Sequence, residues 1–168
     1  MPSRPTFTID HLRELRFAIE VLAAWFVEEW EPWYGPQGDG DAEADLRACM
    51  QRDGLPVCLV ALGGDCEVLG TVALREDPVG SELAPGPWLT GLLVAPDARG
   101  QGIATELVER LEQESRRMGI DAIYVSTDSA SGIMQRRGWQ AIGRSQSLRG
   151  AVSVFRRDLG SRPQDVDS

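Results

Sequence analysis

The segment from Leu92 to Thr105 constrains the fold of this chain more than any other part of the sequence. An apolar run ending at Val94 leads into a turn that contains Gly100 and Gly102, and the turn opens directly into an amphipathic stretch with helical spacing. A helix that starts from such a turn has N–H groups without partners at the positive end of its dipole. The sequence therefore predicts a strand–turn–helix unit that binds an anion.

The residues of this turn suit a diphosphate. Gly100 and Gly102 put no side chain between backbone and ligand, and Arg99 adds a positive charge. A nucleotide P-loop would need a lysine after its last glycine, but Ile103 follows here. A dinucleotide fingerprint would need a preceding parallel βαβ unit, whereas antiparallel strands are predicted before this turn. The remaining alternative is that the glycines serve only to make a tight turn.

Hydrophobic spacing along the rest of the chain predicts one α/β domain over 1–160. Its sheet is predicted to be mixed but mostly antiparallel and flanked by helices, and the tail over 161–168 is predicted to be disordered. Predicted helices span 12–30, 42–52, 102–118 and 129–137, and predicted strands span 7–9, 57–62, 67–75, 88–94, 122–126, 141–148 and 152–157. A loop rich in proline and glycine is predicted over 76–87.

Composition excludes several classes of protein. The chain has 17 Lys+Arg against 26 Asp+Glu, a net charge of −9, which argues against a nucleic-acid partner. No apolar run reaches the roughly 18 residues that a membrane span requires. Three cysteines without CxxC spacing and the absence of an apolar leader after Met1 predict a cytoplasmic location. Their spacing relative to His11 predicts no metal site.

The turn residues resemble motif A of the GNAT superfamily of N-acetyltransferases, whose signature is Gln/Arg-x-x-Gly-x-Gly/Ala. In this chain the motif reads Arg99-Gly100-Gln101-Gly102-Ile103-Ala104, and Leu93-Val94-Ala95-Pro96 matches the family's approach to it. The segment 122–126 resembles the strand after motif A, and Arg137-Gly138-Trp139 resembles the end of motif B, which is usually Gly-Phe. The resemblance extends over about residues 57–159.

This resemblance implies that acetyl-CoA is the cosubstrate, without a metal, and that it lies in a wedge between the splayed strands 88–94 and 122–126. The pantetheine arm would pair with the first strand, and the pyrophosphate would lie on the amides of the turn. A neutral amine would then attack the thioester carbonyl directly, while a backbone N–H polarises that carbonyl. The implied cofactor-binding residues are Leu92, Leu93, Val94, Arg99, Gly100, Gln101, Gly102, Ile103, Ala104, Thr105 and Thr127.

Two positions depart from the family pattern. Met134 stands where many members have a tyrosine that protonates the departing sulfur, and a thioether has no proton to give. Thr127 stands where an asparagine is common. No general acid or base is assigned, and the candidate carboxylates are Glu29, Glu82 and Asp128. Their alternative roles are solvated side chains or, for Asp128, an N-cap.

The segment 25–34 is the candidate acceptor side because it combines tryptophans with carboxylates. Aromatic faces and carboxylates both attract a cationic amine. Trp30 continues a core-facing stripe and is predicted to pack, and the glutamates have a solvated helix end as their alternative role. The predicted acceptor-binding residues are Trp25, Glu28, Glu29, Trp33, Tyr34 and Trp88.

The sequence thus predicts a cytoplasmic N-acetyltransferase that uses acetyl-CoA to acetylate a small cationic amine in a ternary complex, without acylation of a cysteine. Two alternatives stay open. One is a regulatory module that binds acyl-CoA but has lost turnover, and the other is a protein or peptide N-acetyltransferase. No nucleic-acid or membrane partner is expected, and the family analogy admits a homodimer.

Overall fold

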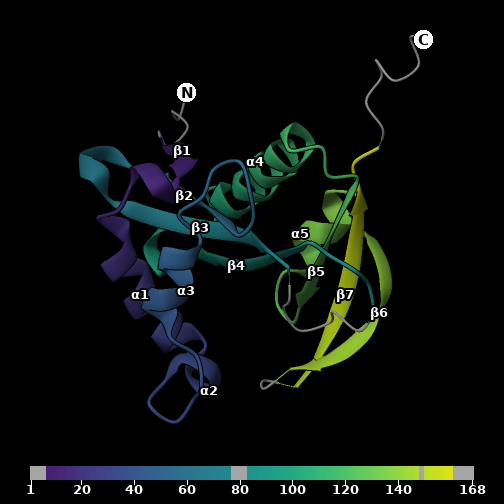
Figure 1. Ribbon diagram of the computed structural model, residues 1–168, viewed down its shortest axis with the longest axis horizontal. Coiled ribbons are helices and arrows are strands. Elements are labelled where there is room, and N and C mark those ends of the chain that lie inside the picture. The colour runs from purple at the N-terminus through teal and green to yellow at the C-terminus, as the bar shows by residue number, and fades with distance from the viewer. Residues whose placement is uncertain (1–6, 77–82, 148–149, 161–168) are drawn as a thin grey trace.

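The computed structural model describes residues 7–76, 83–147 and 150–160 (Figure 1). The strands of this part are β1 (Thr8–His11), β2 (Val57–Leu62), β3 (Val68–Arg75), β4 (Trp88–Val94), β5 (Ala122–Thr127), β6 (Gln140–Ser147) and β7 (Gly150–Asp158). The helices are α1 (Ala18–Glu29), α2 (Glu31–Tyr34), α3 (Ala42–Ala48), α4 (Ile103–Arg117) and α5 (Ser131–Arg136). Short 3₁₀ turns lie at Leu12–Glu14, Gly64–Cys66 and Pro96–Ala98. The tail over 161–168 lies outside the described residues.

The strands form one sheet in the order β1-β2-β3-β4-β5-β7-β6. Every neighbouring pair is antiparallel except β4 and β5, which are parallel. The chain passes from β4 to β5 through α4. This explains the exception, because parallel neighbouring strands need a crossover connection. The predicted α/β class, with a mixed and mostly antiparallel sheet, is confirmed.

Helices cover both faces of the sheet, and strand alternation decides which side chains meet which helix. In β2, Leu59 and Ala61 pack in the same core cluster as α4, whereas Cys58 and Val60 pack with α1 and α3. Met134 of α5 joins the cluster of α4. The two cores therefore share the central strands, and Figure 1 shows α1 and α3 on the opposite side of β2 and β3 from α4.

The predicted helix 12–30 is wrong in its extent, since this range divides into a 3₁₀ turn and α1, and a separate helix, α2, follows it. The 3₁₀ turn Leu12–Glu14 ends at Leu15, whose φ of −131° and ψ of 52° are not helical. α1 ends at Trp30, with φ −120° and ψ 51°, and α2 begins at once. A continuous helix would need an N–H donor at Pro32, so the chain restarts and places this proline in the first turn of α2, where no donor is needed.

The predicted helix 42–52 is also too long. α3 ends at Ala48, and Met50 and Gln51 then form isolated bridges with Val57. The helix predicted over 102–118 is confirmed, since α4 spans Ile103–Arg117. The predicted C-cap is confirmed as well, because Gly119 follows with a φ of +79°. A 3.0 Å bond from the Ile120 amide to the Ser115 carbonyl completes this C-terminal cap.

Within the described ranges, no helix combines the length and the apolar character that crossing a lipid bilayer would require.

Candidate active site

The central feature of the sheet is that β4 and β5 separate. They pair at two positions, Trp88 with Tyr124 and Leu89 with Val125. From Thr90 to Val94, β4 has no partner on β5 in the described part of the chain. The backbone groups that face this opening are therefore available to a bound ligand, as the predicted cofactor wedge requires.

A bulge in β4 accompanies this separation. Thr90 is opposite Ala73 of β3, but Leu93 is opposite Thr71, so β4 contains one extra residue. Gly91 has a φ of +63°, a conformation that side chains disfavour. A bulge bends its own strand and increases the local twist, which turns the end of β4 away from β5.

The turn after β4 forms a cradle of amides. Gly100 and Gly102 both have a φ of +81°, and a Cβ added at either would meet nothing within 4 Å. In the described residues, no backbone N–H from 100 to 105 donates a hydrogen bond, and the first that donates toward the turn is Glu106, to the Gly102 carbonyl at 3.0 Å. These donors lie at the positive end of a 15-residue helix, where the space beside Gly100 and Gly102 is empty of protein, so the turn fits a diphosphate.

Most of the predicted cofactor-binding residues can contact a ligand mainly through backbone groups, because their side chains pack in the protein. Leu92 packs against the cluster of α4 and Leu93 against that of α1, and Ile103 is buried in the core. Arg99 is an exposed residue whose Nε donates to the Val94 carbonyl at 3.1 Å, which holds its guanidinium at the end of β4. The charge that the sequence indicated therefore lies at the mouth of the wedge.

Thr127, at the end of β5, stabilises the turn that precedes α5. Its Oγ1 accepts hydrogen bonds from the amides of Ala130 at 2.8 Å and Ser129 at 3.2 Å. The N-cap role considered for Asp128 stays a prediction beside this acceptor. Because both bonds use the oxygen as acceptor, the hydroxyl proton is still available for a ligand.

Met134 is fully buried in α5, within the cluster of α4. Its thioether packs in the core and has no acidic proton, so it takes no part in proton transfer.

We expect Met134→Leu to keep kcat within about twofold of the wild type and to change the free energy of unfolding by less than about 1.5 kcal/mol, because the volume is conserved. Steady-state kinetics and denaturant unfolding would check both values. A loss of turnover without a loss of stability would show that the sulfur acts in the reaction.

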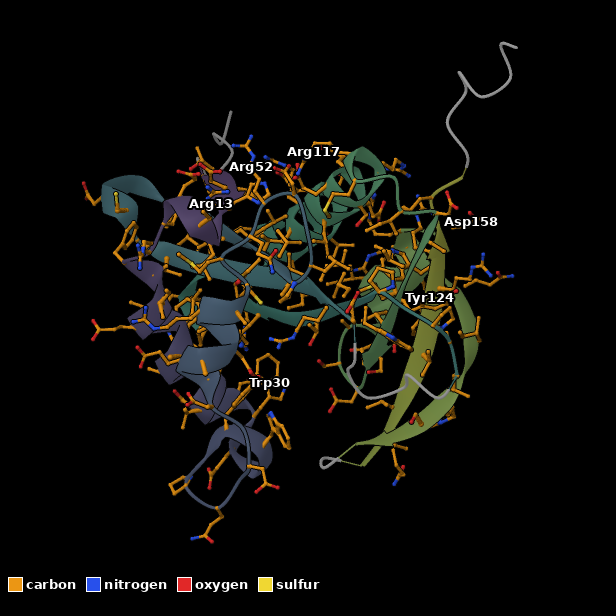
Figure 2. The ribbon with its side chains drawn as sticks, in the orientation of Figure 1. Arg13, Trp30, Arg52, Arg117, Tyr124 and Asp158 are labelled. Carbon is orange, nitrogen blue, oxygen red and sulfur yellow. The ribbon has the colours of Figure 1, made fainter. Side chains whose placement is uncertain are left out.

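The aromatic side chains at the end of α1 gather around Phe26. The ring of Trp30 lies 5.1 Å from that of Phe26, the ring of Tyr34 lies 5.9 Å from it, and Trp33 lies 6.4 Å from Tyr34. The Tyr34 hydroxyl donates to Asp45 Oδ2 at 2.6 Å. Burial and, second, this bond raise the pKa of Tyr34, so the phenol stays protonated. Figure 2 shows Trp30 at this end of the molecule and Tyr124 on the β5 side.

Trp25 is separated from that aromatic group. It lines a pocket of about 710 Å³ together with Phe17 and Val21, and the opposite wall includes Ala95 and Gln101. The structure therefore places Trp25 beside the turn after β4.

The other predicted residues lie in different surroundings. Glu28 is exposed, Glu29 is half-buried, and Trp33 is 43% exposed. Trp88 is fully buried against Tyr124, with ring centroids 5.4 Å apart, and its indole N–H has no partner in the described residues. Glu82 lies outside the described residues.

Sequence reasoning missed Arg75 and Tyr124 at the base of the wedge. Arg75 is opposite Trp88 in the register and lies 3.7 Å from Asp45, while Tyr124 is opposite Trp88 on the other side. Arg75 is the one charged residue of β3 and Tyr124 is the one aromatic residue of β5, which is the signal that the sequence offered.

The cysteines differ in exposure. Burial raises the pKa of the Cys49 thiol to about 11 and that of the Cys58 thiol to about 12, whereas Cys66 is exposed. A thiolate is the nucleophile, so the two buried thiols are inert near neutral pH. Among the described residues, no three His, Cys, Asp or Glu side chains gather as a metal site.

We expect a disulfide reagent to titrate one of the three thiols in the native protein at pH 7.5 and all three after denaturation. Cys66→Ser should remove the native reaction, since only Cys66 is accessible. Rapid reaction of two or more thiols in the folded protein would contradict the burial of Cys49 and Cys58.

Comparison with known proteins agrees with this geometry. Residues 22–138 match the model of the acetyltransferase (GNAT) family. An aminoglycoside N(6′)-acetyltransferase type 1 of Serratia marcescens is 29% identical over 142 residues, which are 83% of this chain and 94% of that protein. In structure, the chain resembles an aminoglycoside 6′-N-acetyltransferase complexed with coenzyme A, with a TM-score of 0.72, 16% identity and coverage of 93% and 99% of the two chains. It also resembles the aminoglycoside 6′-N-acetyltransferase of Enterococcus faecium, with a TM-score of 0.71, 18% identity and coverage of 93% and 99%.

The family match covers more than half of the chain and includes both the turn and the wedge. Its cosubstrate, acetyl-CoA, has the diphosphate that the amide cradle fits. The chain therefore belongs to the acetyltransferase (GNAT) family and is an acetyl-CoA-dependent N-acetyltransferase.

Proposed function

We propose that this enzyme acetylates a primary amine of a small polycationic acceptor, of which an aminoglycoside is the first candidate, by direct transfer in a ternary complex. The supporting observation is the charge of the segment 17–46, which contains no Lys, Arg or His. Its acidic residues are Glu20, Glu28, Glu29, Glu31, Asp39, Asp41, Glu43 and Asp45. Eight of the chain's 26 acidic residues therefore lie in a segment that also carries the aromatic group.

This combination suits a cation with several amines. Carboxylates attract such a molecule at long range, and exposed rings such as that of Trp33 offer cation–π contact. The curated relative of Serratia marcescens is named for acetylation of an aminoglycoside, which is a polycation of this kind.

The residues of this chain bind and orient the reactants. The amides of 100–105 would hold the diphosphate, and the unpaired edge of β4 from Thr90 to Val94 would align the pantetheine arm. A backbone N–H of this edge would polarise the acyl carbonyl. When bound, acetyl-CoA supplies the acetyl group as an activated thioester.

Direct transfer is favoured by the cysteines. Cys49 and Cys58 are buried, and their raised pKa values, about 11 and about 12, keep them protonated. Cys66 lies in the turn between β2 and β3 and lines the pocket that Trp25 and Gln101 also line, so direct transfer requires that Cys66→Ser keep its turnover. The proposal also locates the reaction in the cytoplasm.

An acceptor panel tests this function. Release of coenzyme A thiol would be followed with aminoglycosides, polyamines, arylamines, amino acids and peptides, at saturating acetyl-CoA. Turnover with aminoglycosides, and a KM for them that rises with salt, would support the proposal because screening weakens exposed charge pairs. Turnover with arylamines or peptides alone would overturn the acceptor class. Binding of acetyl-CoA without turnover on any acceptor would indicate a regulatory module instead.

Charge variants give the panel a control. Glu28→Gln combined with Glu31→Gln should raise the KM for an aminoglycoside, since both side chains are exposed near the aromatic group. Glu14→Gln combined with Asp121→Asn is the matched control, because this pair removes the same charge from two exposed residues outside the segment 17–46. An equal effect of both sets would mean that only the overall charge of the protein matters.

A further inference from the structure

The wedge divides the molecule into two halves. The first half contains β1–β4 with α1–α4, and the second contains β5–β7 with α5. α4 belongs to the first half because it packs against β2, β3 and β4. In the described part of the chain, β4 and β5 are the one pair of strands hydrogen-bonded across the halves, at two positions, and apolar side chains of α4 share a core with those of β5, α5 and β7. Side chains must therefore set how far the wedge opens.

Glu112 of α4 is placed to do this. Its side chain is fully buried, yet all of its partners in the described residues belong to the second half. Oε1 accepts from Arg137 Nη2 at 2.7 Å and is 3.5 Å from Arg157 Nε, and Oε2 accepts from Trp139 Nε1 at 3.1 Å. One carboxylate thus joins α4 to the segment between α5 and β6 and to the C-terminal end of β7.

The surroundings of this Glu112 cluster (Glu112, Arg137, Trp139 and Arg157) leave little freedom. Gly138 has a φ of +85°, and a Cβ there would come within 3.0 Å of Arg157 Nη1. Arg137 forms a short charge-assisted hydrogen bond with the buried carboxylate, and Arg157 adds an ion-pair contact at 3.5 Å. A buried carboxylate with such partners holds the segments that carry them at a defined distance.

We propose that Glu112 is a positioning residue that sets the width of the wedge, and thereby the affinity for the pantetheine arm of acetyl-CoA. The proposal rests on placement of that arm between β4 and β5. Glu112 acts through Arg137, Trp139 and Arg157, and β7 passes its position on to β5 by strand pairing, without contact between Glu112 and the reactants.

The test compares Glu112→Gln with a matched variant on the same helix, Glu114→Gln. Glu114 is 8% exposed and ion-paired, but its partners are His11 at 3.0 Å, Arg117 at 3.0 Å and Arg110 at 3.5 Å, all in the first half. Figure 2 shows Arg117 on the same side of the molecule as Arg13 and Arg52. The two substitutions remove the same charge from similar burial, but only one removes a tie across the wedge.

We expect Glu112→Gln to raise the KM for acetyl-CoA by about tenfold or more. A small shift of β5 relative to β4 would misplace the pantetheine arm, and small misplacements that originate far from the reacting atoms can have effects of this size. The KM for the acceptor should change much less. Glu114→Gln should leave the KM for acetyl-CoA within about twofold, because it lacks coupling to the second half. Adenosine 3′,5′-diphosphate, which has no pantetheine arm, should inhibit the wild type and Glu112→Gln equally. Equal KM changes in the two variants, or no change in either, would overturn the proposal.

If Glu112→Gln does not fold, Arg137→Met removes the 2.7 Å tie from the other side and is expected to give the same selective rise. Failure of the wedge placement itself is recognised separately. If acetyl-CoA does not bind in the wedge, replacing Gly100 and Gly102 by glutamate would leave its binding intact. If only the positioning role fails, the same replacement would abolish binding, whereas Glu112→Gln would leave the KM for acetyl-CoA unchanged.

Discussion

Replacement of Gly100 and Gly102 together by glutamate should abolish binding of acetyl-CoA. Both glycines have a φ of +81°, and the space where a Cβ would lie is empty of protein. The two substitutions would put side chains into the volume that we assign to the diphosphate and would place two carboxylates at the positive end of α4. Repulsion between these carboxylates and the phosphates, together with loss of the amide geometry, removes the cradle.

Thermal unfolding with and without the ligand measures this effect. At a concentration of acetyl-CoA 100 times its Kd, the wild type should gain about 2.7 kcal/mol. For a domain of this size, the gain corresponds to a Tm increase of roughly 5–10 °C. The double variant should show no increase.

Gly119→Glu is the matched control, because Gly119 has a φ of +79°, has equally empty surroundings and lies at the other end of α4. It should show the conformational cost of the substitution while keeping the full Tm increase with acetyl-CoA. A double variant that still gains stability from acetyl-CoA would refute the assignment of the turn as the diphosphate site.

Leu107→Ala should lower the free energy of unfolding by about 2–5 kcal/mol, the range observed when a buried leucine is truncated. Leu107 is fully buried on α4, and its Cδ1 would be 3.1 Å from a Cβ placed on Gly70 of β3. This close approach leaves the surrounding backbone little room to collapse into the cavity. Denaturant unfolding gives the value directly.

Ile142→Ala is the control for that loss. Ile142 lies on the edge strand β6 and is 40% exposed, so its truncation should change the free energy of unfolding by about 0.5 kcal/mol or less. Comparable losses in the two variants would mean that α4 is not packed on the sheet as described.

The helix predicted over 12–30 shows how hydrophobic spacing can mislead. Leu15 keeps the helical spacing of its neighbours, but its backbone is not helical, and the break at Trp30 precedes Pro32. Spacing along the chain reports which side chains face the core, and a helix followed by a turn can satisfy the same spacing. Docking on β2 and β3 therefore decides where the helices begin and end.

The acceptor residues show a second limit. Trp25 and Trp30 are five residues apart, yet one lines a pocket beside the turn and the other packs on Phe26. Tyr34 contacts Asp45 across 11 positions of sequence, and no spacing rule relates those two. The same holds for Glu112 and its partners, which are 25 or more positions away.

The features that could be predicted from the sequence are those that depend on residues close together in the chain. These are the strands, the glycines of the turn, the start of α4 and its cap at Gly119, because dihedral preferences and unpaired amides act within a few residues. The tertiary structure alone decided the bulge at Gly91, the two-pair contact of β4 with β5 and the tie from Glu112. Such features arise when segments distant in the chain pack together, since burial and charge pairing depend on which faces meet and local preferences do not specify those partners.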